Sequence, residues 1–130
     1  MLRLFMLRLL PVLLLTSAAA VWFNAVQGNS PYVMRNLLPL LVVVALSALT
    51  VWRGKGRWTG TGWQLALGTL GFAIPALGLS AYLHHAYAVN LNGMFSGAEN
   101  PLQLFRYLPY YTTLAGGIGF AIGWIVGGKL

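Results

Sequence analysis

Few side chains in this 130-residue sequence are of types that could carry out chemistry. Glu99 is its one acidic residue, and cysteine is absent, so a carboxylate pair, a thiolate nucleophile and a disulfide are excluded within the chain. The remaining candidates are the adjacent His84 and His85, and the arginines Arg35 and Arg106, each of which comes shortly before a Leu-Pro pair. None of these residues forms a catalytic motif, so we expect no enzymatic activity from the chain alone.

His84 and His85 suggest a metal or haem site, because neutral imidazole is a common ligand of both. Adjacent helical residues point about 100° apart, however, so the two rings cannot clamp one haem from both faces. Within the chain, further ligands are offered only by Glu99 and Met94. We therefore favour two polar residues that end a helix at the water boundary. His84 and His85 remain weak metal candidates, and no cofactor is expected.

Arg35 and Arg106 each stand at the start of an expected helix, on the side of the membrane that carries few charges. A guanidinium near a helix N-terminus favours an anion. With the nearby Tyr107 and Tyr110, the two arginines form a candidate site for the phosphate headgroup of a lipid or a lipid-linked substrate. The alternative is that both arginines only anchor their helices at the interface, or that one of them pairs with Glu99.

The elements that must position these residues are membrane-spanning helices. Hydrophobic residues make up 58% of the chain and charged residues only 7%, whereas a soluble domain carries roughly a quarter charged residues. About 20 apolar residues are needed to cross a bilayer. The sequence therefore predicts an all-α polytopic membrane protein, one domain over residues 1–130. Its four transmembrane helices form one bundle and span about 4–27, 32–52, 63–85 and 104–127.

The basic residues define the expected orientation. With the N-terminus inside, six of them lie on the cytoplasmic side and only Arg35 and Arg106 lie outside, in agreement with the Lys and Arg bias of cytoplasmic loops. We therefore expect an N-in/C-in protein of a bacterial inner membrane. The six residues are Arg3, Arg8, Arg53, Lys55, Arg57 and Lys129.

The densest basic cluster is the Arg-Gly-Lys-Gly-Arg segment at residues 53–57. Such clusters recruit anionic lipid or an acidic partner in some membrane proteins, and in others they only fix the topology, which is the interpretation we favour here. The glycines do not match a phosphate-binding loop, because the Gly-Lys-Ser/Thr ending is missing. Basic residues elsewhere are scattered at helix ends, so no nucleic-acid partner is expected.

The first segment has a second interpretation. Arg3 and Arg8 precede an apolar run and a group of small residues, as in a secretory signal peptide. The hydrophobic stretch continues through residues 21–26, so its length favours a helix that stays attached.

The last expected helix carries a stripe of small residues. Ala115, Gly119, Gly123 and Gly127 recur at every fourth position and so share one face. A face without side chains lets another helix approach closely in a membrane. We expect the stripe to pack within the bundle, with the Thr16–Ala20 face of the first helix as a candidate mate. The alternative is a partner subunit or a second copy of the chain.

Three functions follow as expectations. The first is a small accessory or assembly subunit of a larger membrane complex, without catalysis of its own, whose partners are other membrane subunits. The second is binding or transport of an anionic phospholipid or lipid-linked substrate at the outer leaflet, through Arg35 and Arg106. The third is a holin-like, membrane-permeabilising protein. The expected helices have no ionisable residue near their middle, which argues against a proton-coupled transporter.

Overall fold

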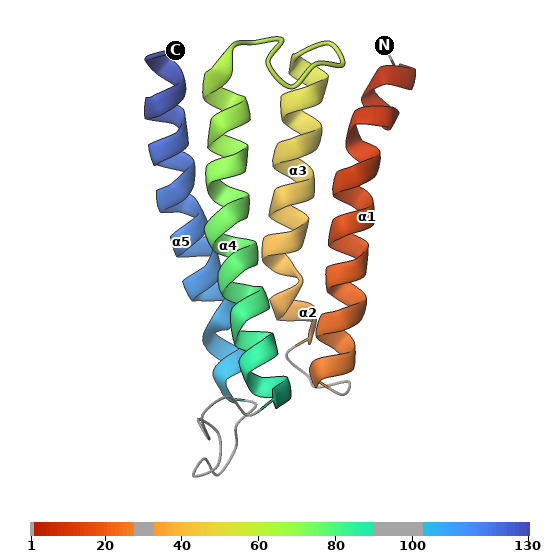
Figure 1. Ribbon diagram of the computed structural model, residues 1–130, viewed down its shortest axis with the longest axis vertical. Coiled ribbons are helices and arrows are strands. Elements are labelled where there is room, and N and C mark those ends of the chain that lie inside the picture. The colour runs from red at the N-terminus through yellow and green to blue at the C-terminus, as the bar shows by residue number, and fades with distance from the viewer. Residues whose placement is uncertain (1, 28–32, 90–102) are drawn as a thin grey trace.

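The computed structural model describes residues 2–27, 33–89 and 103–130, which form a bundle of helices (Figure 1). Its elements are α1 (Leu2–Gln27), α2 (Val33–Asn36), α3 (Leu38–Arg53), α4 (Trp63–Val89) and α5 (Gln103–Gly128). The helices α1, α4 and α5 and the combined α2–α3 segment are each long and apolar enough to cross a membrane. An all-helical chain with four membrane-length helices is thus confirmed for these residues, and it is consistent with a multi-pass membrane protein.

A break at Leu37 separates α2 from α3, where the sequence predicts one helix over residues 32–52. Pro39 accounts for the break, since proline has no N–H to donate to the carbonyl of Arg35 and its ring would clash with that carbonyl. In the first turn of α3 the missing N–H needs no partner, and Pro39 lies there. The N–H of Leu41 still reaches the carbonyl of Leu37 at 3.0 Å. The short helix α2 therefore carries Arg35 as a separate turn that packs against α5.

The helices α4 and α5 pack on each other more extensively than any other pair, with their backbones in contact. A Cβ atom added to Gly119 would collide with the carbonyl oxygen of Gly71, and one added to Gly123 would collide with that of Leu67. Neither position leaves room for a side chain. The small residues on α5 therefore allow an approach that larger side chains would prevent.

The partner of this stripe differs from the candidate that the sequence suggests. The Thr16–Ala20 face of α1 has suitable spacing, yet the structure places α4 against the stripe. A Cβ atom added to Gly127 would lie 2.6 Å from the Cα atom of Gln64, at the start of α4. Ala115, at the other end of the stripe, is half-buried. Glycines on α4 itself, Gly71 above all, make this match possible.

A small buried core joins α3 to α4. Val43 of α3 packs with Phe72 and Ala76 of α4, and partly buried side chains of α1 and α5 flank them. A polar contact lies nearer the end of α3, where the hydroxyls of Thr50 and Thr69 are 2.9 Å apart. The interior is therefore held by both apolar packing and hydroxyl hydrogen bonds.

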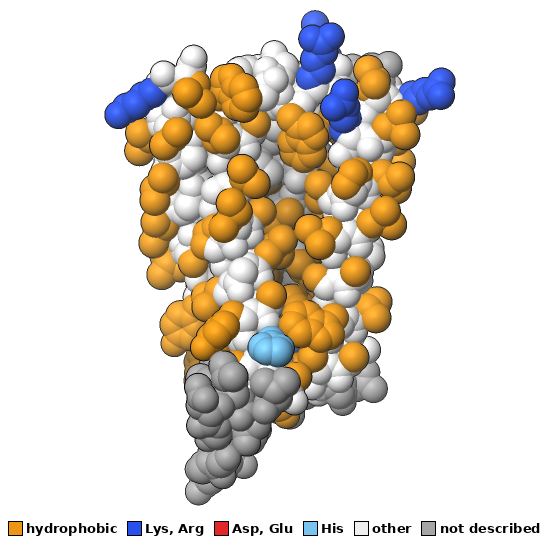
Figure 2. Space-filling model, in the orientation of Figure 1, with side chains coloured by type: hydrophobic (Ala, Val, Ile, Leu, Met, Phe, Trp, Pro, Cys, Tyr) orange, Lys and Arg blue, Asp and Glu red, His pale blue; other side chains and the backbone are white. Residues whose placement is uncertain are grey.

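Apolar side chains cover much of the outside of the bundle (Figure 2), whereas several hydroxyl side chains are buried inside it. Val21 is 71% exposed and Ile118 is 57% exposed. A soluble fold avoids such large exposed apolar surfaces. In apolar surroundings, by contrast, polar groups must find partners within the protein. The buried hydroxyl residues are Thr16, Ser47, Thr50, Thr69, Ser80 and Thr112.

Basic side chains gather at one end of the bundle (Figure 2), which carries both termini and the connection between α3 and α4 (Figure 1). Arg53 is the last residue of α3, and Lys55 follows in that connection. Arg35, in α2, lies at the opposite end of the α2–α3 segment. The two ends of the bundle therefore differ strongly in positive charge.

Candidate functional site

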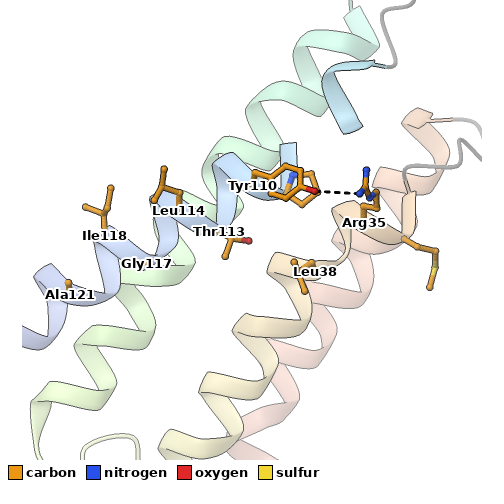
Figure 3. Close-up of a pocket in the computed structure, with 10 residues that line it drawn as sticks. Arg35, Leu38, Tyr110, Thr113, Leu114, Gly117, Ile118 and Ala121 are labelled. Carbon is orange, nitrogen blue, oxygen red and sulfur yellow. Dashed lines mark hydrogen bonds between the residues drawn. The ribbon is translucent and has the colours of Figure 1, made fainter. Parts of the chain in front are cut away.

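A groove of about 1000 Å³ runs between α5 and the α2–α3 segment (Figure 3). Met34, Arg35 and Leu38 line it on one side. On the other side the lining residues recur along α5 at intervals that place them on one face of that helix. They are Pro109, Tyr110, Thr113, Leu114, Gly117, Ile118 and Ala121. The groove therefore follows the axis of α5.

The length of the groove is close to the thickness of one membrane leaflet. Tyr110 and Ala121 are separated by about eleven residues, which is roughly 16 Å along a helix. Half of a typical hydrocarbon core is about 15 Å. Polar side chains lie near Tyr110, and the lining beyond Thr113 is apolar. The groove thus has a polar mouth and an apolar trough.

Arg35 and Tyr110 meet at the mouth of the groove. The Nη2 atom of Arg35 donates to the hydroxyl oxygen of Tyr110 across 3.5 Å, and both side chains are exposed (Figure 3). A guanidinium has five N–H donors, so one long bond to a phenol leaves most of them for another acceptor. The Tyr110 hydroxyl keeps its own proton to donate. The mouth therefore offers a positive charge and several donors to an anion.

Two residues shape the trough below the mouth. A Cβ atom added to Gly117 would have no other atom within 4 Å, so this glycine leaves the groove open. The hydroxyl oxygen of Thr113 is buried and has no hydrogen-bond partner among the residues that the structure describes. Thr113 lies about one helical turn deeper than Tyr110.

The structure brings together only part of the predicted lipid site. Arg35 and Tyr110 meet, although 75 residues separate them. Tyr107 is 48% exposed and does not line the groove. Arg106 belongs to α5, but its side chain lies outside the described part of the structure, and so does Glu99. The pairing of the two arginines is therefore not tested.

His84 is completely buried, which corrects the expectation that it lies at the water boundary. Its ring stacks on that of Phe23, with the centroids 3.8 Å apart and an interplanar angle of 9°. The Nδ1 atom lies 2.7 Å from the carbonyl oxygen of Ser80, and the Nε2 atom lies 2.8 Å from the amide nitrogen of Gln27. His85 is exposed. Across the described ranges, no cluster of three or more His, Cys, Asp and Glu side chains forms a metal site.

The lining of the groove combines polar and apolar groups. Its lining supplies a guanidinium, a phenol and a threonine hydroxyl above an apolar trough, with no carboxylate, imidazole or thiol among the lining residues. Such a lining is complementary to an anion joined to an apolar chain. Comparisons of the chain with protein-family models, curated proteins and solved structures find no match. Its function is therefore inferred from its own geometry.

Proposed function

We propose that this chain is an N-in/C-in protein of a bacterial inner membrane that binds an anionic phospholipid or a lipid-linked phosphate in the outer leaflet, without catalysis of its own. One observation carries the proposal. Arg35 and Tyr110 lie 3.5 Å apart at the mouth of an apolar groove whose length is close to that of one leaflet. Headgroup and acyl chain would both find complementary surfaces there.

The expected binding mode follows from the order of residues along the groove. The phosphate accepts hydrogen bonds from the guanidinium of Arg35 and from the hydroxyl of Tyr110. The glycerol esters lie about one turn deeper, beside Thr113. The acyl chain then packs on Gly117 and Ile118. Because lipid tails are as apolar as the groove, we expect the phosphate contacts to supply most of the selectivity.

The distribution of charge supports the proposed orientation. Six of the eight basic residues lie at the basic end of the bundle. They stand in the first two turns of α1, at the end of α3, in the α3–α4 connection and at the C-terminus. Short segments rich in Lys and Arg stay on the cytoplasmic side. With that end inside, Arg35 and the mouth of the groove face the outer leaflet.

Native mass spectrometry of the purified chain, exposed to equal amounts of phosphatidylglycerol and phosphatidylcholine, tests the phosphate contacts. Charge-assisted hydrogen bonds contribute about 1.5–3 kcal/mol, so Arg35→Gln should reduce retention of phosphatidylglycerol roughly tenfold or more. Tyr110→Phe should have a smaller effect in the same direction. Tyr111→Phe is the matched control, because Tyr111 is 56% exposed and does not line the groove.

Filling the trough tests the place of the acyl chain. Gly117→Leu should reduce lipid retention, because its side chain would occupy the groove. Gly78→Leu is the control, since a Cβ atom at Gly78 also has open space but lies outside the groove. Unchanged lipid retention in both Arg35→Gln and Gly117→Leu would refute the proposal. Competition by a polyprenyl phosphate would assign the site to lipid-linked phosphates rather than to bulk phospholipid.

A second candidate function is an accessory subunit of a larger membrane complex, and the packing of α1 favours it. Buried positions on this helix form a narrow seam, so most of its apolar surface is left uncovered by the bundle. Extraction from the native membrane in mild detergent would reveal a stable assembly if partner subunits cover this surface. The buried positions are Leu9, Thr16, Phe23 and Gln27.

The holin-like role remains a prediction. Release of a trapped dye from liposomes at low protein content would support it, and liposomes that stay tight would argue against it.

A further inference from the structure

A second pocket, of about 680 Å³, lies at the basic end of the bundle, beside the α3–α4 connection. Arg53 and Lys55 supply two positive charges to it, and two tryptophans form part of its wall. We propose that this pocket binds the phosphate headgroup of an anionic phospholipid in the leaflet at the basic end of the bundle. The lining residues are Trp52, Arg53, Lys55, Thr61, Gln64, Leu65 and Trp124.

The charges of the pocket have no counter-ion in its lining. Glu99 is the one acidic residue of the chain, and it is not among the lining residues. Two cations at one pocket repel each other, and a bound anion removes that repulsion. Arg53 presents a planar fork that binds phosphate oxygens in pairs, while Lys55 adds a mobile point charge.

The backbone at Lys55 adopts a conformation that glycine takes up more easily than lysine. Lys55 has φ = +56°, in the left-handed region that favours glycine. It occupies the position after a helix end where glycine is the usual residue, since its N–H bonds to the carbonyl of Trp52 and that of Gly56 bonds to Val51. Glycine would make the same turn with less strain. A lysine here costs the turn some strain and places a positive charge in the lining of the pocket.

The walls of the pocket favour a phospholipid over a free anion. Trp52 is 53% exposed and Trp124 is 42% exposed, and such half-exposed indoles are typical of the headgroup level of a membrane. Leu65 adds an apolar surface below them. Gln64 donates to the carbonyl of Trp124 at 3.5 Å and so links α4 to α5 within the wall of the pocket. A phosphate at the two cations would thus have apolar walls for the glycerol and the start of the chains.

This pocket is separate from the groove at Arg35, and its assignment does not depend on that site. Arg35 and Arg53 are 18 residues apart along the α2–α3 segment, roughly 27 Å at the rise of a helix. A bilayer core is about 30 Å thick. The two sites therefore lie near opposite faces of a membrane, and one lipid cannot fill both.

The test uses the full chain in the Arg35→Gln background, so that the outer groove contributes little. Phosphatidylglycerol is titrated into phosphatidylcholine nanodiscs that hold the chain, and bound lipid is counted by native mass spectrometry. The pair Arg53→Gln/Lys55→Gly should weaken retention of phosphatidylglycerol roughly tenfold, since two charge-assisted contacts are lost. The matched pair Arg3→Gln/Arg57→Gln removes the same charge from residues that do not line the pocket. It should change the retention of phosphatidylglycerol by less than about twofold.

Equal losses of phosphatidylglycerol retention in the two double variants would overturn the proposal. They would show that the lipid is attracted by the overall charge of the basic end and not by this pocket. Displacement of phosphatidylglycerol by excess inorganic phosphate would overturn the assignment to a lipid. Lys55→Gly alone separates binding from folding. We expect this variant to melt no lower than the unaltered chain, because glycine relieves the left-handed backbone, and still to retain less phosphatidylglycerol. Unchanged retention in this single variant would remove Lys55 from the site.

Discussion

The Nε2 atom of His84 lies 2.8 Å from the amide nitrogen of Gln27, so a buried hydrogen bond joins the end of α1 to α4. The other ring nitrogen, Nδ1, lies 2.7 Å from the carbonyl oxygen of Ser80, which can only accept. We therefore assign the ring proton to Nδ1. The Nε2 atom then accepts from the amide of Gln27, and both nitrogens of the neutral imidazole are used.

Replacing His84 by Phe should lower the free energy of unfolding by about 1–3 kcal/mol, because the amide of Gln27 would be left buried without this partner. Phenylalanine keeps a flat ring against Phe23, so the loss reports on the hydrogen bonds more than on stacking. Thermal or denaturant unfolding in detergent measures the change. His85→Phe is the control, since His85 is exposed and its replacement should cost less than about 0.5 kcal/mol.

The double variant Gln27→Leu/His84→Phe identifies the cause of that loss. If an unpaired amide is responsible, replacing both partners by apolar side chains should recover most of the stability. A double variant whose loss equals the sum of the two single losses would show that the residues contribute independently.

Gly119→Ala should destabilise the bundle by about 1–3 kcal/mol, as expected for an overpacked contact. The new methyl group would collide with the carbonyl oxygen of Gly71, so α4 and α5 would have to move apart. Gly117→Ala is the matched control two residues away, where a Cβ atom has open space. Unfolding in detergent should separate the two variants clearly. Equal stability of both would contradict the close backbone contact.

These glycines show how far the sequence predicts the fold. Hydropathy alone predicts four membrane-length helices, because an apolar run of that length has few alternatives. The stripe of small residues predicts a close helix contact but not its partner. Thr16 and Ala20 on α1 have the same four-residue spacing, and Gly68 and Gly71 on α4, three residues apart, also share a face. Only the three-dimensional arrangement selects α4.

The candidate site was only partly predictable for the same reason. Arg35 is conspicuous in the sequence as a charge in an apolar region, whereas its contact with Tyr110 depends on how α2 packs against α5. The break at Leu37 that frees α2 can be attributed to Pro39 only once the helix is seen. His84 looks like the polar end of a helix, and its burial depends on Gln27, 57 residues away in the chain.

Thr69→Val should destabilise the bundle by about 0.5–1.5 kcal/mol, the range of polar contacts between membrane helices. The substitution keeps the shape of the side chain but removes the contact of 2.9 Å with the hydroxyl of Thr50, which joins α4 to α3. Thr59→Val, at an exposed position, should leave stability unchanged in the same unfolding measurement. A loss at Thr59 as large as that at Thr69 would point to the substitution type rather than to the contact.

Single cysteines should report the orientation of the chain against a clean background, because it contains no native cysteine. In spheroplasts, a membrane-impermeant maleimide should label Met34→Cys, at a 77% exposed position in α2, and leave Arg57→Cys unlabelled until the membrane is opened. This expectation rests on the six basic residues at that end, because short segments rich in Lys and Arg stay on the cytoplasmic side. The opposite labelling would place the groove at Arg35 in the inner leaflet. Arg35 and Tyr110 could then still bind a phosphate, but the ligand would have to come from the cytoplasmic leaflet.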